Sequence, residues 1–229
     1  MSKTLISKVW LLLLLIFLNL TCKKNSTNDP ARNSSASFLK EKKVLMDSIV
    51  IFQEEGNYYL ASFNYLIIAS YFYQNEEYDS TLYYNNLARK YSFIKENEIM
   101  RSDALYQLKQ YEASVGALDT IIFKAPSIDL YHSRGLINMK LSNYKSAIED
   151  FNSVIKYDSS RVESMLQLGY SYGLDGNLDK AIGILNYVKK KFPDNCHAYY
   201  YSALVYEKFN MAAEKEGEIA KSIDLGCVD

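Results

Sequence analysis

Histidine and cysteine side chains are the best candidates for metal binding or nucleophilic chemistry in this chain of 229 residues, which has two His and three Cys. His132 and His197 lie far apart, and neither has a cysteine or carboxylate at the spacing of a common zinc motif. We therefore expect no metal site and interpret both histidines as surface or groove-lining residues.

Glycines and carboxylates offer no better case for chemistry. Gly169, Gly173 and Gly176 resemble a glycine-rich phosphate loop in density, but no strand precedes them and the Gly-Lys-Ser/Thr sequence of a phosphate cradle is missing. Acidic stretches such as Glu149-Asp150 fit exposed helix faces, and nothing marks a paired acid and base. The sequence predicts no catalytic residue and no cofactor, and hence no enzyme.

The composition favours a helical globular domain. The chain is 48% hydrophobic and 23% charged, with 21 Tyr but only 3 Pro and 9 Gly, which is too few turn formers for a many-stranded sandwich. Lys and Arg number 26 against 27 Asp and Glu, so the net charge is -1. Without a basic footprint to displace phosphate counterions, nucleic acid is not an expected partner.

The N-terminal segment has the pattern of an export signal. Lys3 and Lys8 precede a run of apolar residues from Val9 to Leu20 that is too short to span a bilayer as a helix. Residues 1–21 are predicted to be a signal peptide and residues 22–36, which are polar, a flexible tether. A folded domain is expected over 37–229, with its first helix running from Ser37 to Glu55.

Self-comparison of this domain reveals a period of 33 or 34 residues in three aligned registers. Small residues occupy the positions of the first and second registers given below, and large apolar residues occupy those of the third. The first comprises Ala69, Ser102, Gly135, Gly169 and Ala203; the second Thr81, Ser114, Ala147 and Ala181; and the third Leu118, Phe151, Leu185 and Ile219. Asn85 occupies the third-register position at the start of the series.

These registers resemble the tetratricopeptide repeat, most clearly over Val162 to Asn195, where Leu168-Gly169, Tyr172, Ala181, Leu185 and Pro193 fall on the family's motif positions. The resemblance implies an all-α, right-handed superhelix of about five helix-turn-helix repeats, with the helix from Ser37 covering the first. The last helix either serves as its own lid or docks on a partner or a second copy.

A second resemblance concerns the end of the signal. Leu20-Thr21-Cys22 is similar to the lipobox of bacterial lipoproteins, in which the cysteine becomes the acylated mature N-terminus. The resemblance implies lipidation at Cys22 and a location in the bacterial envelope, on the outer membrane where the cell has one. Asn19 departs from the family's usual Leu, so simple secretion remains the alternative.

The repeat resemblance also implies a concave groove lined by the first helix of each pair, and the inward positions are mostly apolar or aromatic. They are Phe63, Leu66, Tyr73, Tyr106, His132, Leu136, Met139, Leu166, Tyr170, Leu174, Tyr200 and Leu204. Such a surface suits a protein or peptide partner in envelope assembly, and a glycan or other small ligand is the alternative. The individual tyrosines can instead pack between neighbouring helices.

Two smaller features complete the expectations. Glu98, Arg101, Arg134 and Asn138 occupy usually apolar positions of adjacent first helices, so a buried Glu98–Arg134 pair is one reading and snorkelling arginine stems the other. Cys196 and Cys227 begin and follow the last helix pair, so antiparallel packing brings them to one end. There they can form a disulfide or remain two free thiols.

Overall fold

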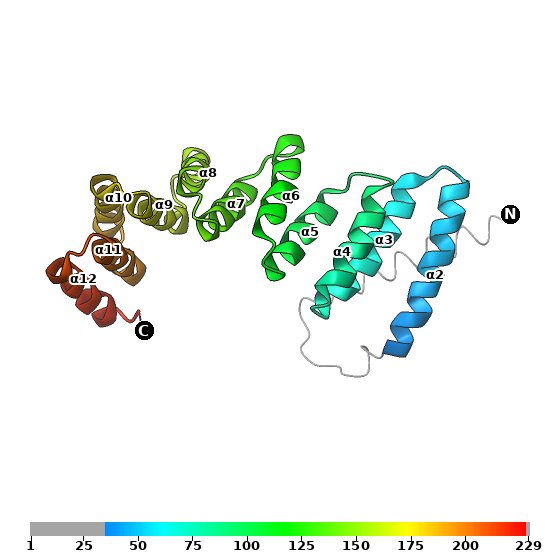
Figure 1. Ribbon diagram of the computed structural model, residues 1–229, viewed down its shortest axis with the longest axis horizontal. Helices are drawn as coiled ribbons and strands as arrows, with labels where there is room; N and C mark the ends of the chain where they lie inside the picture. The colour runs from blue at the N-terminus through cyan, green and yellow to red at the C-terminus, as the bar shows by residue number, and fades with distance from the viewer. Residues whose placement is uncertain (1–34, 228–229) are drawn as a thin grey trace. The chain divides into compact units, whose positions relative to one another are not determined.

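The structure is a computed structural model that describes residues 35–227. Over this range the protein is all-α, with eleven helices in sequential antiparallel pairs after the first (Figure 1). The helices are α2 (Ser35–Glu54), α3 (Tyr58–Gln74), α4 (Tyr78–Arg89), α5 (Lys95–Gln107), α6 (Tyr111–Lys124), α7 (Ile128–Lys140), α8 (Tyr144–Tyr157), α9 (Val162–Leu174), α10 (Leu178–Lys191), α11 (Cys196–Lys208) and α12 (Ala212–Asp224). The predicted fold class, five helix pairs preceded by one helix, is confirmed.

The predicted signal peptide 1–21, Cys22 and most of the tether lie outside the described residues. The first described helix begins at Ser35, two residues before its expected start. Among residues 35–227, no helix is both long enough and apolar enough to cross a membrane.

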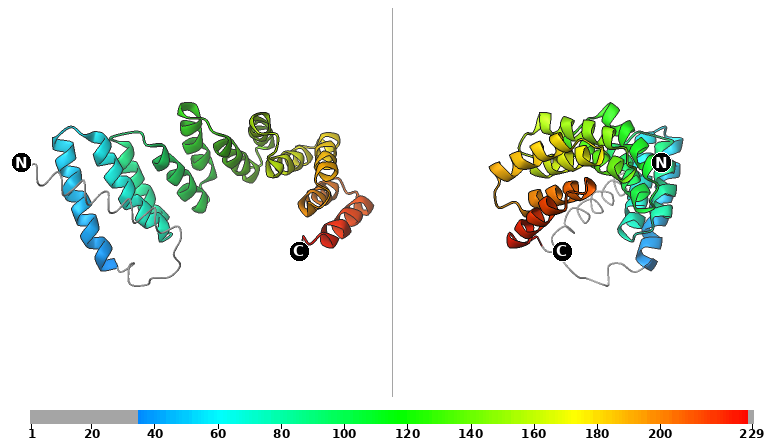
Figure 2. Two further views of the ribbon diagram at one scale, coloured as in Figure 1. Left: turned by 180° about the vertical axis from the view of Figure 1, so that it is seen from behind. Right: turned by 60° about the vertical axis from the view of Figure 1, so that its left-hand side comes forward.

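The described chain divides into two compact units. Unit 1 ends at Asn97, within α5, and unit 2 begins at Glu98. Unit 1 packs α2 and α4 on either side of α3, as Figures 1 and 2 both show. The face of α2 that carries Leu45, Ile49 and Phe52 packs with Ile68 of α3 in one core, which is how the first helix covers the first pair.

In two hairpins of unit 2, α7–α8 and α9–α10, the first and third registers meet. A Cβ atom added to Gly135 of α7 would lie 2.8 Å from the Phe151 ring of α8, and one added to Gly169 of α9 would lie 2.8 Å from Leu185 Cγ of α10. Both large side chains are fully buried. The small residue therefore makes room for the large one, which explains the alternation of residue size with the repeat.

A further register becomes visible only in the backbone. The residues after the first helix of each pair have positive φ: Glu76, Lys109, Ser142, Gly176 and Asn210. In each case the next amide donates to the carbonyl five residues earlier, as Asn177 N does to Tyr172 O at 2.8 Å. This is the Schellman arrangement that closes a helix C-terminus. The residue type varies, so the sequence periodicity does not reveal this position.

Candidate partner-binding face

Three first helices of unit 2 are neighbours, with α9 in contact with both α7 and α11. The approach of α9 and α11 depends on Gly173, because a Cβ there would lie 2.6 Å from Val205 Cγ2. Ser164 of α9 reaches α7, where its Oγ lies 2.8 Å from Nδ1 of His132. Burial lowers the pKa of His132, which favours the neutral imidazole. His132 therefore links two helices, and its role here is structural.

Tyr170 of α9 and Tyr200 and Tyr201 of α11 form an aromatic cluster that we call the tyrosine face. The Tyr170 and Tyr201 ring centroids are 5.4 Å apart, and those of Tyr200 and Tyr201 are 6.0 Å apart. Tyr200 is 38% exposed, whereas Tyr170 and Tyr201 are half-buried. The face thus presents one open ring supported by two that are held in place.

A hydrogen bond from Gln167 fixes the orientation of Tyr201. The Gln167 side-chain amide donates to Tyr201 Oη at 2.7 Å and to Glu163 Oε1 at 2.9 Å. Desolvation raises the pKa of Tyr170 and of Tyr201, so both phenols keep their protons at neutral pH. A partner would therefore meet uncharged hydroxyl groups beside the exposed carboxylate of Glu163.

The twelve predicted groove residues differ in their exposure and packing. Leu66 and Leu166 are only 8% and 1% exposed, so the prediction that they contact a partner is wrong; they face the core because each follows the buried stripe of its helix. Tyr73 packs on Tyr78 and Tyr106 on Tyr111, across their own hairpins. Tyr73 and Tyr106 therefore pack between helices, which was the alternative interpretation of the tyrosines.

The other predicted residues are at least partly accessible. Leu136 and Met139 pack against the α7–α9 core, while Phe63, Leu174 and Leu204 are half-buried and Tyr200 is the most open. Phe63, Leu66 and Tyr73 belong to unit 1 and the remaining nine to unit 2. Sequence reasoning missed Tyr201, although its adjacency to Tyr200 on a helix predicts a second ring about 100° away.

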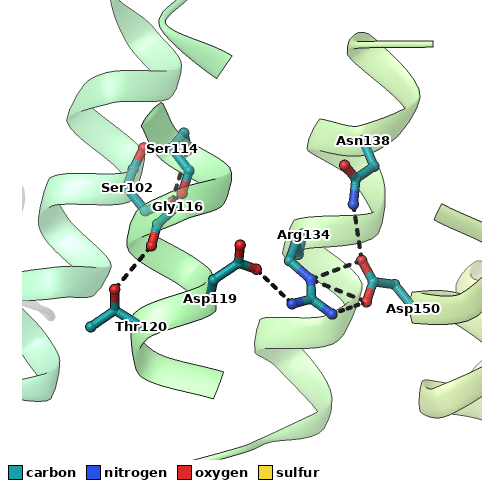
Figure 3. A network of polar contacts seen from close by, with 8 residues as sticks. All are labelled: Ser102, Ser114, Gly116, Asp119, Thr120, Arg134, Asn138 and Asp150. Atoms are coloured by element: carbon teal, nitrogen blue, oxygen red, sulfur yellow. Dashed lines mark hydrogen bonds and ion pairs between the residues drawn. The ribbon is translucent and has the colours of Figure 1, made fainter. Parts of the chain in front are cut away.

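A polar network joins α6, α7 and α8, with Arg134 at its centre (Figure 3). Its Nη2 donates to Asp150 Oδ1 at 2.6 Å and its Nη1 to Asp119 Oδ1 at 2.6 Å. Asn138 Nδ2 donates to the other Asp150 oxygen at 3.2 Å. Burial raises the pKa of Asp150, opposed by Arg134, while the bond to Asp150 raises the pKa of the guanidinium.

This network corrects two expectations. The predicted Glu98–Arg134 pair is wrong: Arg134 pairs with Asp150 and Asp119, and Glu98 Oε2 lies 4.0 Å from Arg101 Nη1 on its own helix. The expectation that Glu149-Asp150 is an exposed acidic stretch is wrong for Asp150, which is 2% exposed. The reason is geometric, because Asp150 shares the buried face of α8 with Ala147 and Val154 and reaches Arg134 on the preceding helix. The network ties helices together and is not a reaction centre.

At the C-terminal end, a disulfide joins Cys196, the first residue of α11, to Cys227, beyond α12, with Cα atoms 5.5 Å apart. Cys196 Sγ lies 3.7 Å from His197 Nδ1. The expectation that neither histidine has a cysteine at ligand spacing is therefore wrong for His197, which lies beside a disulfide sulfur. Adjacent residues in the first turn of a helix were not among the motif spacings considered.

Comparison with known proteins agrees with this architecture. Residues 163–195 match the family model described as "Tetratricopeptide repeat". Among solved structures, MamA 41-end from Desulfovibrio magneticus RS-1 is similar with a TM-score of 0.63 and 17% identity, covering 72% of this chain and 94% of that one. A tetratricopeptide repeat protein from Parabacteroides merdae ATCC 43184 has a TM-score of 0.63 and 18% identity, with coverage of 81% and 80%.

Two further proteins are similar to this chain over very different shares of their own length. The structure of YrrB, described as "a TPR protein with an unusual peptide-binding site", has a TM-score of 0.63 and 17% identity, covering 78% of this chain and 92% of that one. The mouse protein "Sperm-associated antigen 1" (Mus musculus) is 25% identical over 104 residues, which is 45% of this chain and 12% of that protein. The chain thus matches a small part of that longer relative. Residues 163–195 thus match one tetratricopeptide repeat, and the paired helices of residues 35–227 form a fold similar to that of proteins built from such repeats.

Proposed function

We propose that this chain is a non-catalytic scaffold that binds a segment of another protein across the tyrosine face. The observation that carries the proposal is the pairing of an open ring, Tyr200, with two half-buried rings, Tyr170 and Tyr201, of which Tyr201 is also held by a hydrogen bond from Gln167. Rigid tyrosines supply contact area at a small entropic cost and are enriched at binding hot spots. The peptide-binding site in the description of YrrB supports this class of function.

The chemistry of the face suggests how the partner segment is held. Tyr200 provides a ring for an apolar anchor, the half-buried Leu204 one turn further along α11 extends the apolar surface, and Glu163 offers an acceptor for a backbone amide or a basic side chain. The raised pKa values of Tyr170 and Tyr201 keep these two phenols neutral, so their part in recognition should vary little with pH near neutrality.

A displayed library of random peptides, selected on the purified chain, provides the test. We expect enriched peptides to bind Tyr200→Ala about 10- to 30-fold more weakly, as loss of a hot-spot ring predicts. Tyr187→Ala is the matched control, since Tyr187 is 52% exposed but lies on α10, a second helix. Equal affinity for both variants and the unsubstituted chain would remove the tyrosine face from the proposal.

A glycan or other small ligand is the second candidate for the same face. The exposed Glu163 carboxylate beside the tyrosine rings gives the mixture of aromatic and polar groups that a sugar can bind, and the buried Gln167 holds Glu163 and Tyr201 in place. Saturable thermal stabilisation by a glycan without any protein, lost in Tyr200→Ala, would favour this candidate over a peptide.

We also propose that Cys22 is lipidated and holds the scaffold on an envelope membrane of a bacterium, the outer membrane where the cell has one. The support is the basic and apolar signal pattern that ends in Leu20-Thr21-Cys22. Metabolic labelling with a fatty acid, followed by mass measurement of the N-terminal peptide, tests this. We expect label on the unsubstituted chain and none on Cys22→Ser; an unlabelled, released protein would indicate simple secretion instead.

A further inference from the structure

A second candidate site lies at the end of the last hairpin, apart from the tyrosine face. One ligand atom from each of Cys196, His197 and Cys227 lies within 4.8 Å of the other two. His197 is exposed and both cysteines are half-buried, so reductants and ions in solution can reach the group.

The distances suit a zinc ion once the sulfurs separate. Zn–S and Zn–N bonds of about 2.3 and 2.05 Å at tetrahedral angles place sulfur and nitrogen about 3.6 Å apart. The Sγ of Cys196 and the Nδ1 of His197 are 3.7 Å apart. Two sulfur ligands would need about 3.8 Å between them, and in the disulfide they are bonded, so the oxidised chain cannot supply both as thiolates.

The local structure permits this separation. Cys227 lies outside α12, which ends at Asp224, and follows Gly226, whose φ is +88°. The Cys227 N–H donates to the Ser222 carbonyl at the end of α12 at 3.1 Å, so the sulfurs separate by rotation of the cysteine side chains, which leaves this bond in place. Cys196 is the first residue of the 13-residue helix α11, where the positive end of the helix dipole favours the thiolate that a metal requires.

We propose that Cys196, Cys227 and His197 form a redox-gated Zn²⁺ site, which is closed by the disulfide and opened by reduction. A dithiol reductant transfers two electrons and two protons to the S–S bond, which gives two thiols and leaves the reductant as a disulfide. Zn²⁺ then displaces the two thiol protons and forms two Zn–S bonds. The neutral His197 donates its Nδ1 lone pair, and water completes the four-coordinate set.

Cobalt spectroscopy provides a direct test. The experiment uses the chain with Cys22→Ser, which leaves Cys196 and Cys227 as its two cysteines, reduced with a phosphine that is then removed without air. Titration with Co²⁺ should give thiolate-to-cobalt charge-transfer bands that saturate at one equivalent and disappear on addition of Zn²⁺. The oxidised chain should show no such bands. Absence of the bands from the reduced chain, or equal binding by the oxidised chain, would overturn the proposal.

Variants separate this site from adventitious thiol binding. Cys227→Ser should abolish the bands, and His197→Ala should weaken Co²⁺ binding by about tenfold or more, equivalent to about 1.4 kcal/mol or above. His132→Ala is the control and should bind normally. Circular dichroism of each reduced variant verifies that the helices are retained. If His197→Ala binds as tightly as the parent, the three-ligand site is wrong.

Discussion

The second helices of the two units differ at one equivalent position of the repeat. In unit 2 this position holds Leu118, Phe151, Leu185 and Ile219, and two of them, Phe151 and Leu185, are fully buried against a glycine of the partner helix. In unit 1 it holds Asn85, which is equally buried but whose side-chain amide has no hydrogen-bond partner among the described residues. Asn97 Nδ2 donates to the Asn85 backbone oxygen at 3.2 Å.

This contrast shows two ways of building the same hairpin. In unit 2 the α7–α8 and α9–α10 pairs are stabilised by a small residue that makes room for a large one. Unit 1 instead relies on α2, whose apolar face joins the α3 core and whose Phe38 ring stacks on Tyr71. The added helix α2 therefore buries apolar surface, which Asn85 does not provide. The hairpin keeps its shape although a different type of residue fills this position.

The largest loss of stability is expected for Phe151→Ala in unit 2. Removal of a fully buried ring that fills the space beside Gly135 should lower the free energy of unfolding by about 3–5 kcal/mol. Asn85→Ala is the matched variant in unit 1 and should cost less than about 1 kcal/mol, since no side-chain hydrogen bond is lost. Urea denaturation followed by circular dichroism measures both, and similar losses would remove the distinction between the units.

The next largest effect concerns the charged network of unit 2. Arg134→Met keeps the stem but leaves the buried Asp150 without its cation, which should cost about 2–4 kcal/mol at neutral pH. Asp119 is 53% exposed, so Asp119→Asn serves as the control and should cost less than about 1 kcal/mol.

This loss should depend on pH. Burial raises the folded-state pKa of Asp150, so stability tied to this group falls as pH rises from its unfolded to its folded pKa. In Arg134→Met a cause that lowers this pKa is removed, and the carboxyl prefers its neutral form more strongly. The stability difference from the parent should therefore shrink as the pH is lowered. A difference that stays constant towards acid pH would contradict an ionised buried Asp150.

The opposite substitution, of the buried polar residue in unit 1 by an apolar one, tests the same difference between the units. Asn85→Leu places in unit 1 the residue type that unit 2 uses, and removes a buried amide whose side-chain atoms find no partner in the described chain. We expect a gain of about 1–2 kcal/mol in the free energy of unfolding, measured by the urea midpoint at constant slope. A loss would show that the site around Asn85 is shaped for the amide.

The smallest expected effect tests the feature that both units share. Lys109 has a φ of +60° at the turn after α5, whereas the equivalent residue after α9 is Gly176. Lys109→Gly should stabilise the chain by about 0.5–1 kcal/mol, because glycine adopts this conformation without a steric cost. Gly176→Lys should destabilise by a similar amount, and thermal unfolding of both variants verifies the sign.

Periodicity explains why the fold could be predicted and the contacts of Arg134 could not. The alternation of small and large residues at a 33- or 34-residue spacing already implies paired helices, since each Gly needs a bulky partner. Asp150, by contrast, looks like one carboxylate of an exposed pair in the sequence. It is buried because it lies three residues after Ala147 and four before Val154, on the buried face of α8. Its partner, Arg134, comes from a different helix, α7, which the sequence around Asp150 does not predict.

The sequence by itself determined the helix pairs, their number and the small and large residues that join them, because these depend on local spacing and side-chain volume. Tertiary structure alone decided that Leu166 is core while Tyr200 is open, and that His197 lies beside a disulfide. The reason is that exposure and proximity depend on how helices distant in the chain cover one another. That outcome is a property of the assembled stack, and no single repeat carries it.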